Sequence, residues 1–323
     1  MQPNPFLQVN TRHFARESRP RYLFLVHAPR SAGESSACSV RSPAALYDLP
    51  EQTHDIFALD RFDAAKSLRD HLYWKCDERC NLVTWTTSLL FALHSGLHRH
   101  RKDDDDHEFE KIFLLMIDTC DFPERTLIKD LGAVNAVNTH GLQQIGYWEG
   151  YLTPRSEYSF GVYLSQGALD IEGRCVQVSF QTLIDLGLFE LFPPLAAEAE
   201  WVKWVRWVIE LREPFYRQEI SISTADEVRI AVQLARDGFG GRWTFPAAAM
   251  LLALKPRANN DQAILEGFKA GFSEDEIRDL SLHDIQVDRD GLPELVQFEK
   301  LVNDIHRRFT GRDISSVFWS VRR

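Results

Sequence analysis

The chain has 323 residues, of which 44% are hydrophobic and 26% charged, which is typical of a folded protein with one large or two ordinary domains. Its 47 acidic residues outnumber its 37 basic ones, and it has no long basic block, so we expect no nucleic-acid partner. No run approaches the roughly 20 apolar residues of a membrane span, and no secretory signal is readable, so we expect an intracellular protein with no membrane partner.

Short elements alternate in the first part of the chain. After a loose segment at 1–20, the apolar run "RYLFLVHA" predicts a buried strand that ends at "PRSAG". Residues 28–55 are rich in Ser, Ala and Pro, which indicates irregular structure. The stretch "DRFDAAKSLRDHLYWK" has apolar residues at helical spacing and predicts a helix that begins near Asp60.

A strand followed directly by a helix is predicted next. "NLVTW" is strand-like, and "TTSLLFALHSGLHRH" predicts a helix with Thr86 or Thr87 as its N-cap. "KIFLLMIDT" is typical of a strand buried on both faces. "FPERTLIKDL" predicts a short helix, and "YSFGVYL" and "GRCVQVSF" predict two further strands.

Helical patterns dominate after residue 193. "AEAEWVKWVRWVIELRE" predicts one helix, capping boxes begin two more at Thr224 and Ser273, and "LPELVQFEKLVNDIHRRF" predicts a last amphipathic helix. We therefore predict an α+β fold, with a mixed β-sheet core and helices at 21–193 and a helical region packed on it at 194–310. The segment 311–323 is a tail. No linker separates the two parts, which leaves open whether they share one core.

Metal ligands occur in pairs. His94 and His98, and also Cys76 and Cys80, are four residues apart, but neither pair has further ligands at a spacing known for zinc sites. We expect no metal site, with the histidines on the polar end of a helix. The five cysteines are few and scattered, which favours a reducing compartment.

Three strand-and-loop motifs carry a resemblance. The chain has "LFLVH" at 23–27, "NLVTWTTSLLFAL" at 81–93 and "GVYLSQGAL" at 161–169. These resemble an uncharacterised fungal domain family whose motifs read Leu-Phe-Arg-Val-His, Leu-Val-Ser-Trp-Thr-Ser and Gly-Glu-Tyr-Leu-Ser-Gln-Gly. The resemblance covers about 20–257. The order of the motifs is similar to the Arg, Ser-x-Ser, Glu arrangement of the ADP-ribosyltransferase-like fold.

That similarity implies a site for NAD. In this chemistry an Arg or His on the first strand holds the dinucleotide, Ser and Thr residues support the nicotinamide pocket, and a Glu stabilises an oxocarbenium-like transition state. The residues that it assigns to cofactor binding are His27, Thr84, Thr86, Thr87 and Tyr163. The catalytic candidates are His27, Thr86 and Gln166.

Two positions depart from the pattern. The Arg position is Leu25 and the Glu position is Val162, and neither side chain binds phosphate or stabilises positive charge. His27 could replace the first function, and Glu157 or Gln166 could approach the second. The resemblance therefore implies a degenerate or inactive relative that still binds a nucleotide.

Two alternatives stay open. One is a protein-interaction module, with an unknown protein partner, that uses the helix bearing Trp201, Trp204 and Trp207. Such a stripe is more often core than platform. The other is an enzyme of a different class that uses His27 with Thr86, which requires the two side chains to converge in one pocket.

Overall fold

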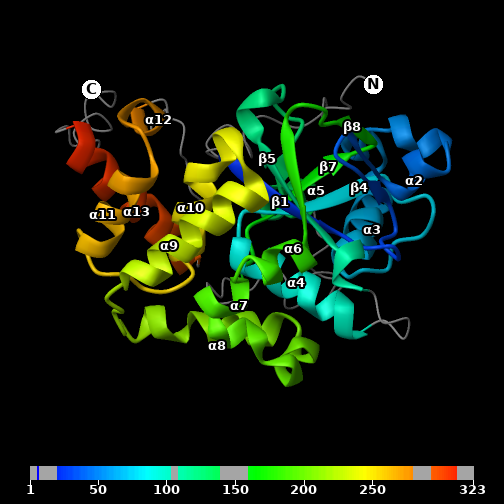
Figure 1. The fold of residues 1–323 in the computed structure, drawn as a ribbon. Coiled ribbons are helices and arrows are strands. Elements are labelled where there is room, and N and C mark those ends of the chain that lie inside the picture. The colour runs from blue at the N-terminus through cyan, green and yellow to red at the C-terminus, as the bar shows by residue number, and fades with distance from the viewer. Residues whose placement is uncertain (1–5, 7–19, 103–107, 139–158, 279–291, 311–323) are drawn as a thin grey trace.

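A computed structural model describes Phe6 and residues 20–102, 108–138, 159–278 and 292–310 (Figure 1). The predicted α+β class is confirmed, with a sheet-containing part followed by a helical C-terminal part. The predicted tail 311–323, almost all of the segment 1–20 and the candidate Glu157 lie outside the described residues. Within the described part of the chain, no helix is long and apolar enough to cross a membrane.

The main sheet has six strands in the order β6-β7-β4-β1-β5-β9, and each neighbouring pair is antiparallel. Its members are β1 (Tyr22–His27), β4 (Leu82–Thr86), β5 (Phe113–Asp118), β6 (Ile128–Lys129), β7 (Val162–Gln166) and β9 (Cys175–Ser179). A smaller antiparallel sheet contains β2 (Glu34–Ser35), β3 (Ser39–Arg41) and β8 (Ala168–Asp170). The three strands that carry the sequence motifs, β7, β4 and β1, are neighbours in the main sheet.

Twelve α-helices are described. Their bounds are α2 (Pro43–Leu46), α3 (Arg61–Leu72), α4 (Leu89–Lys102), α5 (Asp130–Asn138), α6 (Phe180–Asp185), α7 (Leu188–Leu191), α8 (Val205–Tyr216), α9 (Ala225–Leu234), α10 (Thr244–Leu252), α11 (Gln262–Gly271), α12 (Glu274–Arg278) and α13 (Pro293–Thr310). The capping box of Thr224 with Glu227 is present at the start of α9, as predicted. Ser273 likewise exchanges hydrogen bonds with Glu276 before α12.

The two faces of the main sheet are covered differently. Phe24, Thr86 and Val162 are paired across the three motif strands and share one face, which helices cover. The opposite face carries Leu25 and Trp85, which pack in a cluster with Val40 and Leu169 of the smaller sheet. Alternate residues of one motif strand therefore lie in different environments.

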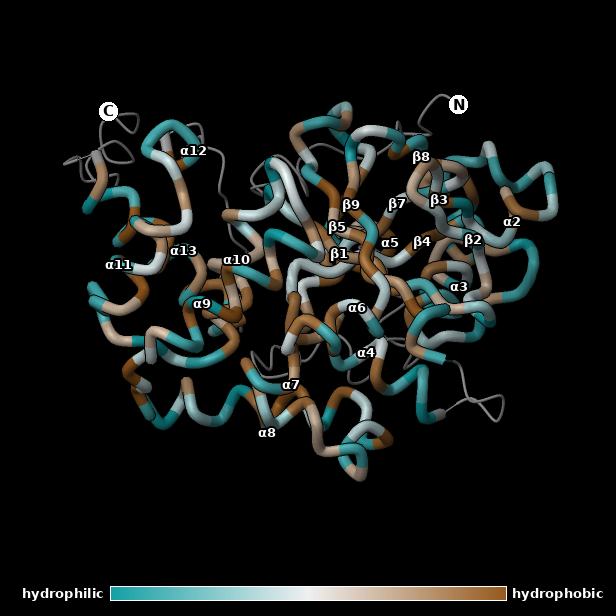
Figure 2. Tube along the Cα trace, viewed as in Figure 1, coloured by the Kyte–Doolittle hydropathy of each residue, from teal (hydrophilic) through white to brown (hydrophobic). Residues whose placement is uncertain are grey.

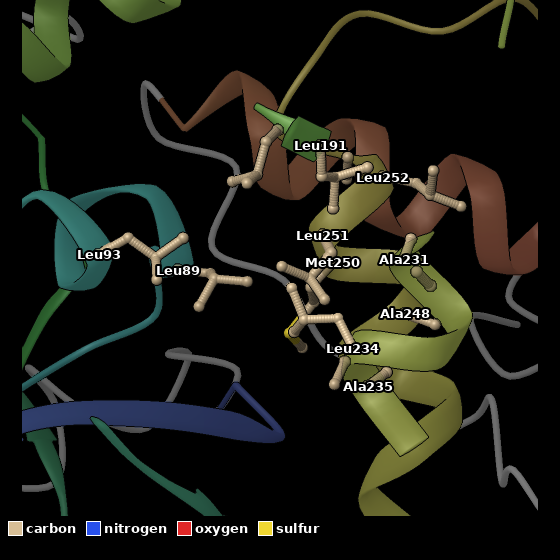
Figure 3. Close-up of a cluster of buried hydrophobic side chains, with 14 of the residues drawn as sticks. Leu89, Leu93, Leu191, Ala231, Leu234, Ala235, Ala248, Met250, Leu251 and Leu252 are labelled. Carbon is tan, nitrogen blue, oxygen red and sulfur yellow. The ribbon is translucent and has the colours of Figure 1, made fainter. Parts of the chain in front are cut away.

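One hydrophobic core joins the sheet to the helical region. Residues of β1, β5 and α4 belong to the same buried cluster as residues of α9, α10 and α13. Figure 3 shows part of it, with Leu89 and Leu93 from α4 beside Leu234 of α9 and Leu251 of α10. In Figure 2 the hydrophobic residues concentrate in the interior strands and on the inner sides of the helices. The parts 21–193 and 194–310 thus share their interior.

Two predicted helices differ from the structure. The helix predicted within 122–131 is a turn at Arg125, where φ is +63°, followed by β6, because Ile128 and Lys129 pair with β7. The single helix predicted for 197–213 is a 3₁₀ helix at Glu198–Lys203 and then α8, interrupted at Trp204 with φ of +52°. Edge-strand pairing and core packing override local propensity at both places.

The three tryptophans of this segment face inward. Trp201 is fully buried and donates its Nε1 hydrogen to the carbonyl oxygen of Leu195 at 2.8 Å. Trp204 and Trp207 are half-buried and pack against the same core. They therefore form core contacts, and none of the three offers a fully exposed ring as a binding platform.

Candidate functional site

A pocket forms where β1 and β4 separate. The two strands are paired at Phe24 and Thr86, and no further pair joins them toward His27 and Leu82. The space between them, which we call the β1–β4 pocket, has a volume of about 310 Å³. Its walls come from the end of β1, the 30–43 segment, the end of α3, the start of β4 and Arg99 of α4.

The lining of this pocket is basic. It includes Arg30, Arg41 and Arg99, and no aspartate or glutamate is among the described lining residues, although Glu34 lies just outside and pairs with Arg41 at 3.5 Å. Arg99 donates a hydrogen bond to Ser31 Oγ at 3.1 Å and lies over the ring of Trp74, 5.5 Å from its centre. This arrangement is unusual in a chain with a net charge of −10, and it favours an anionic ligand.

His27 lines the same pocket and is half-buried. Its Nδ1 atom is buried without a hydrogen-bond partner in the described structure. Burial lowers the pKa of His27, and the nearby charge of Arg99 acts in the same direction. The ring is therefore neutral at pH 7 and offers a hydrogen bond rather than a charge to a ligand.

Thr84 also lines the pocket, from β4. Its Oγ1 atom lies 2.7 Å from Nε2 of His71, at the end of α3. The structure therefore brings together two of the residues predicted from sequence, His27 and Thr84. Leu25, at the predicted Arg position, lines the pocket as well.

The other predicted site residues have structural contacts instead. Thr86 donates a hydrogen bond to the carbonyl oxygen of Phe160 and accepts one from the amide of Ser88. Thr87 is buried, and its amide bonds to the carbonyl oxygen of Gly161. Ser88, rather than either threonine, caps α4, because its Oγ accepts the amide hydrogen of Phe91.

Gln166 and Tyr163 are also inside the protein. The Gln166 side chain is 2% exposed and accepts a hydrogen bond from the amide of Ile56 at 3.2 Å. Tyr163 packs between the two sheets. Neither lines the β1–β4 pocket, and the structure does not join His27 to Thr86 in one site.

Val162 lies away from the pocket. It pairs with Thr86, the last residue of β4, whereas the pocket lies at the start of that strand. Val162 packs there against the buried cluster beneath α3 and α5. A carboxylate at this position would enter an apolar cluster rather than the pocket. The described pocket therefore has no group that could stabilise an oxocarbenium ion by charge.

A second group of reactive side chains adjoins the pocket. His71, Cys76 and Cys80 place one potential ligand atom each within 4.8 Å of one another. The hydrogen bond from Cys76, assisted by His71, lowers the pKa of Cys80 to about 5 against the opposing effect of burial. His71 is not one of the ligand pairs expected from the sequence; it precedes Cys76 by five residues, and the turn at Trp74, where φ is +61°, brings the two together.

The histidine pair on α4, His94 and His98, lies in a different environment from the one predicted. His94 is completely buried and His98 is 9% exposed, with its Nδ1 2.7 Å from the carbonyl oxygen of Trp201. The expectation that they lie on the polar end of a helix is wrong, because the segment around Trp204 covers that face of α4. Burial lowers the pKa of His94 to about 4, and His98 contributes to the shift.

Comparisons with known proteins found no match. No protein-family model, no curated protein and no solved structure matches the chain.

Proposed function

We propose that this protein binds an anionic nucleotide of the NAD or ADP-ribose class in the β1–β4 pocket and does not transfer ADP-ribose. The observation that carries the proposal is a pocket lined by three arginines and no described carboxylate. The resemblance of the three motif strands to the ADP-ribosyltransferase-like arrangement supports the choice of nucleotide.

The lining supplies the groups that such a ligand needs. The positive charges of the arginines in the lining attract the phosphate groups of such a ligand. The exposed ring of Trp74 can stack on a base, and the hydroxyl of Ser31 can contact a ribose. A volume of about 310 Å³ is at the lower end for ligand sites, so it suits part of a dinucleotide rather than all of it.

The same lining argues against catalysis. Removing one preorganised transition-state contact typically costs about 3 to 4 kcal/mol, and here the carboxylate itself is missing from the described pocket. Val162→Glu would not restore it, because residue 162 packs in the cluster beneath α3 and α5. The function is therefore binding, and the substitution serves as a control for the absence of activity.

Thermal unfolding with NAD, ADP-ribose, AMP and uncharged adenosine tests the proposal. We expect the three phosphorylated ligands to raise the melting temperature and adenosine to have a much smaller effect. Arg30→Gln should reduce the shift, whereas Arg229→Gln, an exposed arginine on α9, should leave it unchanged. The absence of any shift at millimolar ADP-ribose, or equal losses in both variants, would refute the proposal.

A further inference from the structure

We infer that His71, Cys76 and Cys80 form a binding site for a zinc-class divalent cation, with Thr84 as its positioning residue. His71, Cys76 and Thr84 also line the β1–β4 pocket, but the inference does not depend on nucleotide binding there. The three side chains come from the last turn of α3 and from the loop that leads into β4.

The loop that carries the two cysteines is shaped by local turns. Trp74 has a φ of +61°, which reverses the chain after α3 and returns Cys76 to His71. The amide of Cys80 then donates a hydrogen bond to the carbonyl oxygen of Asp77, and the amide of Arg79 bonds to the Asp77 side chain. This second turn places Cys80 beside Cys76, so both sulfur atoms face the same ring nitrogen.

The distances between the potential ligand atoms are close to those of a tetrahedral zinc site. His71 Nδ1 lies 3.2 Å from Cys76 Sγ and 3.3 Å from Cys80 Sγ. Zinc–sulfur bonds of about 2.3 Å and zinc–nitrogen bonds of about 2.0 Å separate tetrahedral ligand atoms by about 3.5 Å. A shift of a few tenths of an ångström by each side chain therefore admits the ion.

The second ring nitrogen of His71 has a hydrogen-bond partner, as is usual for histidines that bind metals. His71 Nε2 lies 2.7 Å from Thr84 Oγ1, which can accept its hydrogen and so leave the Nδ1 lone pair directed at the two sulfurs. Histidine ligands are usually oriented by such a partner on the other ring nitrogen. This contact therefore supports a metal site over a chance grouping of two thiols and a histidine.

The chemistry of the donors selects the ion, and the surroundings leave one position open. Two thiolates and an imidazole favour zinc over magnesium, calcium or manganese, which prefer oxygen. All three residues also line a second pocket, with a volume of about 410 Å³, whose lining mixes acidic side chains with Lys66, Lys75 and Arg79. The two thiolates themselves supply the negative charge that attracts a cation, and solvent or a ligand in this pocket can occupy the fourth coordination position.

Cobalt substitution gives the direct test. The protein is stripped of metal under reducing conditions, and Co²⁺ is added while the absorption spectrum is recorded. We expect one ion per chain with thiolate-to-cobalt charge-transfer bands and the visible bands of a tetrahedral site. Zn²⁺ should displace it, with a dissociation constant measured against a chromophoric chelator.

Variants separate this site from other thiols. Cys80→Ser should remove the charge-transfer bands in large part, whereas Cys175→Ser, a thiol elsewhere in the sheet, should leave them intact. Thr84→Val keeps all three ligands and should weaken zinc binding about 10- to 100-fold. Since Cys80→Ser could fail to fold, the wild-type cobalt spectrum alone is decisive: the absence of a thiolate-to-cobalt band in the reduced protein would overturn the inference.

Discussion

A buried ion pair joins the helical region to the sheet. Arg212 of α8 and Glu294 of α13 are 0% and 4% exposed, and two hydrogen bonds of 3.1 and 2.6 Å connect them. Arg212 also donates to the carbonyl oxygen of Ser159, and Ser88 at the start of α4 donates to Glu294. Four separate segments therefore meet at one pair of charges.

The effects of removing the two charges should not add. Glu294→Gln leaves the guanidinium of Arg212 buried without its counter-charge, and we expect a loss of about 3 to 5 kcal/mol in the free energy of unfolding. Arg212→Met should be of similar size. The double variant Arg212→Met/Glu294→Gln buries neither charge, so its loss should be smaller than the sum of the single losses by at least about 2 kcal/mol.

Urea denaturation of the four proteins measures this coupling. The control is the exposed pair of Arg217 and Glu213 on the same helix, whose side chains are 65% and 47% exposed. Glu213→Gln should change the stability by less than about 1 kcal/mol. Additive losses in the double variant, or equal losses in Glu294→Gln and Glu213→Gln, would contradict the predicted coupling of the buried pair.

Two further predictions concern α4. Its buried His94 has a pKa of about 4 when folded against 6.5 when unfolded, so the unfolded chain alone gains the proton and the protein should lose about 2 kcal/mol of stability between pH 7 and pH 5. His94→Leu should remove that loss and His54→Gln, at an exposed site, should not; equal pH dependence in all three proteins would contradict the assignment. A Cβ at Gly96 would lie 2.0 Å from the ring of Phe180, so Gly96→Ala should destabilise by about 1 to 3 kcal/mol despite its better helix propensity, and unchanged or increased stability in thermal denaturation would contradict this packing.

The periodic parts of the sequence predicted their elements correctly. The apolar run of β5, the amphipathic pattern of α13 and the capping box at Thr224 each contain their own structural signal within a few residues. The fold class follows from those local patterns. The division at residue 193 also follows from them, but the shared core does not, because it depends on contacts between distant segments.

The errors arise where tertiary contacts decide. Ile128 lies in a strand because it pairs with β7, and the helix is interrupted at Trp204, whose ring packs against His98 of α4. The alternation of side chains along a strand predicts that His27 and Leu25 share a face, and this signal lies within the strand itself. The separation of β4 from β1, which opens the pocket, depends on the whole sheet and has no such local signal.

The lining of the β1–β4 pocket was predicted in part for the same reason. The motif positions point to His27 and Thr84, whereas the arginines come from the loop after β1, from β3 and from α4, which no motif connects. His71 was missed because its distance from Cys76 in the sequence fits no known zinc pattern. Its closeness to the next strand could have been a signal, since α3 leads directly through the two cysteines into β4.

Titration calorimetry of ADP-ribose into the unmodified protein tests the central claim most directly. At low ionic strength we predict saturable binding with one ligand per chain, and an affinity that falls as salt is raised because the arginines of the β1–β4 pocket bind its phosphates. No heat of binding at millimolar ligand, or an affinity unaffected both by salt and by Arg30→Gln, would contradict the account.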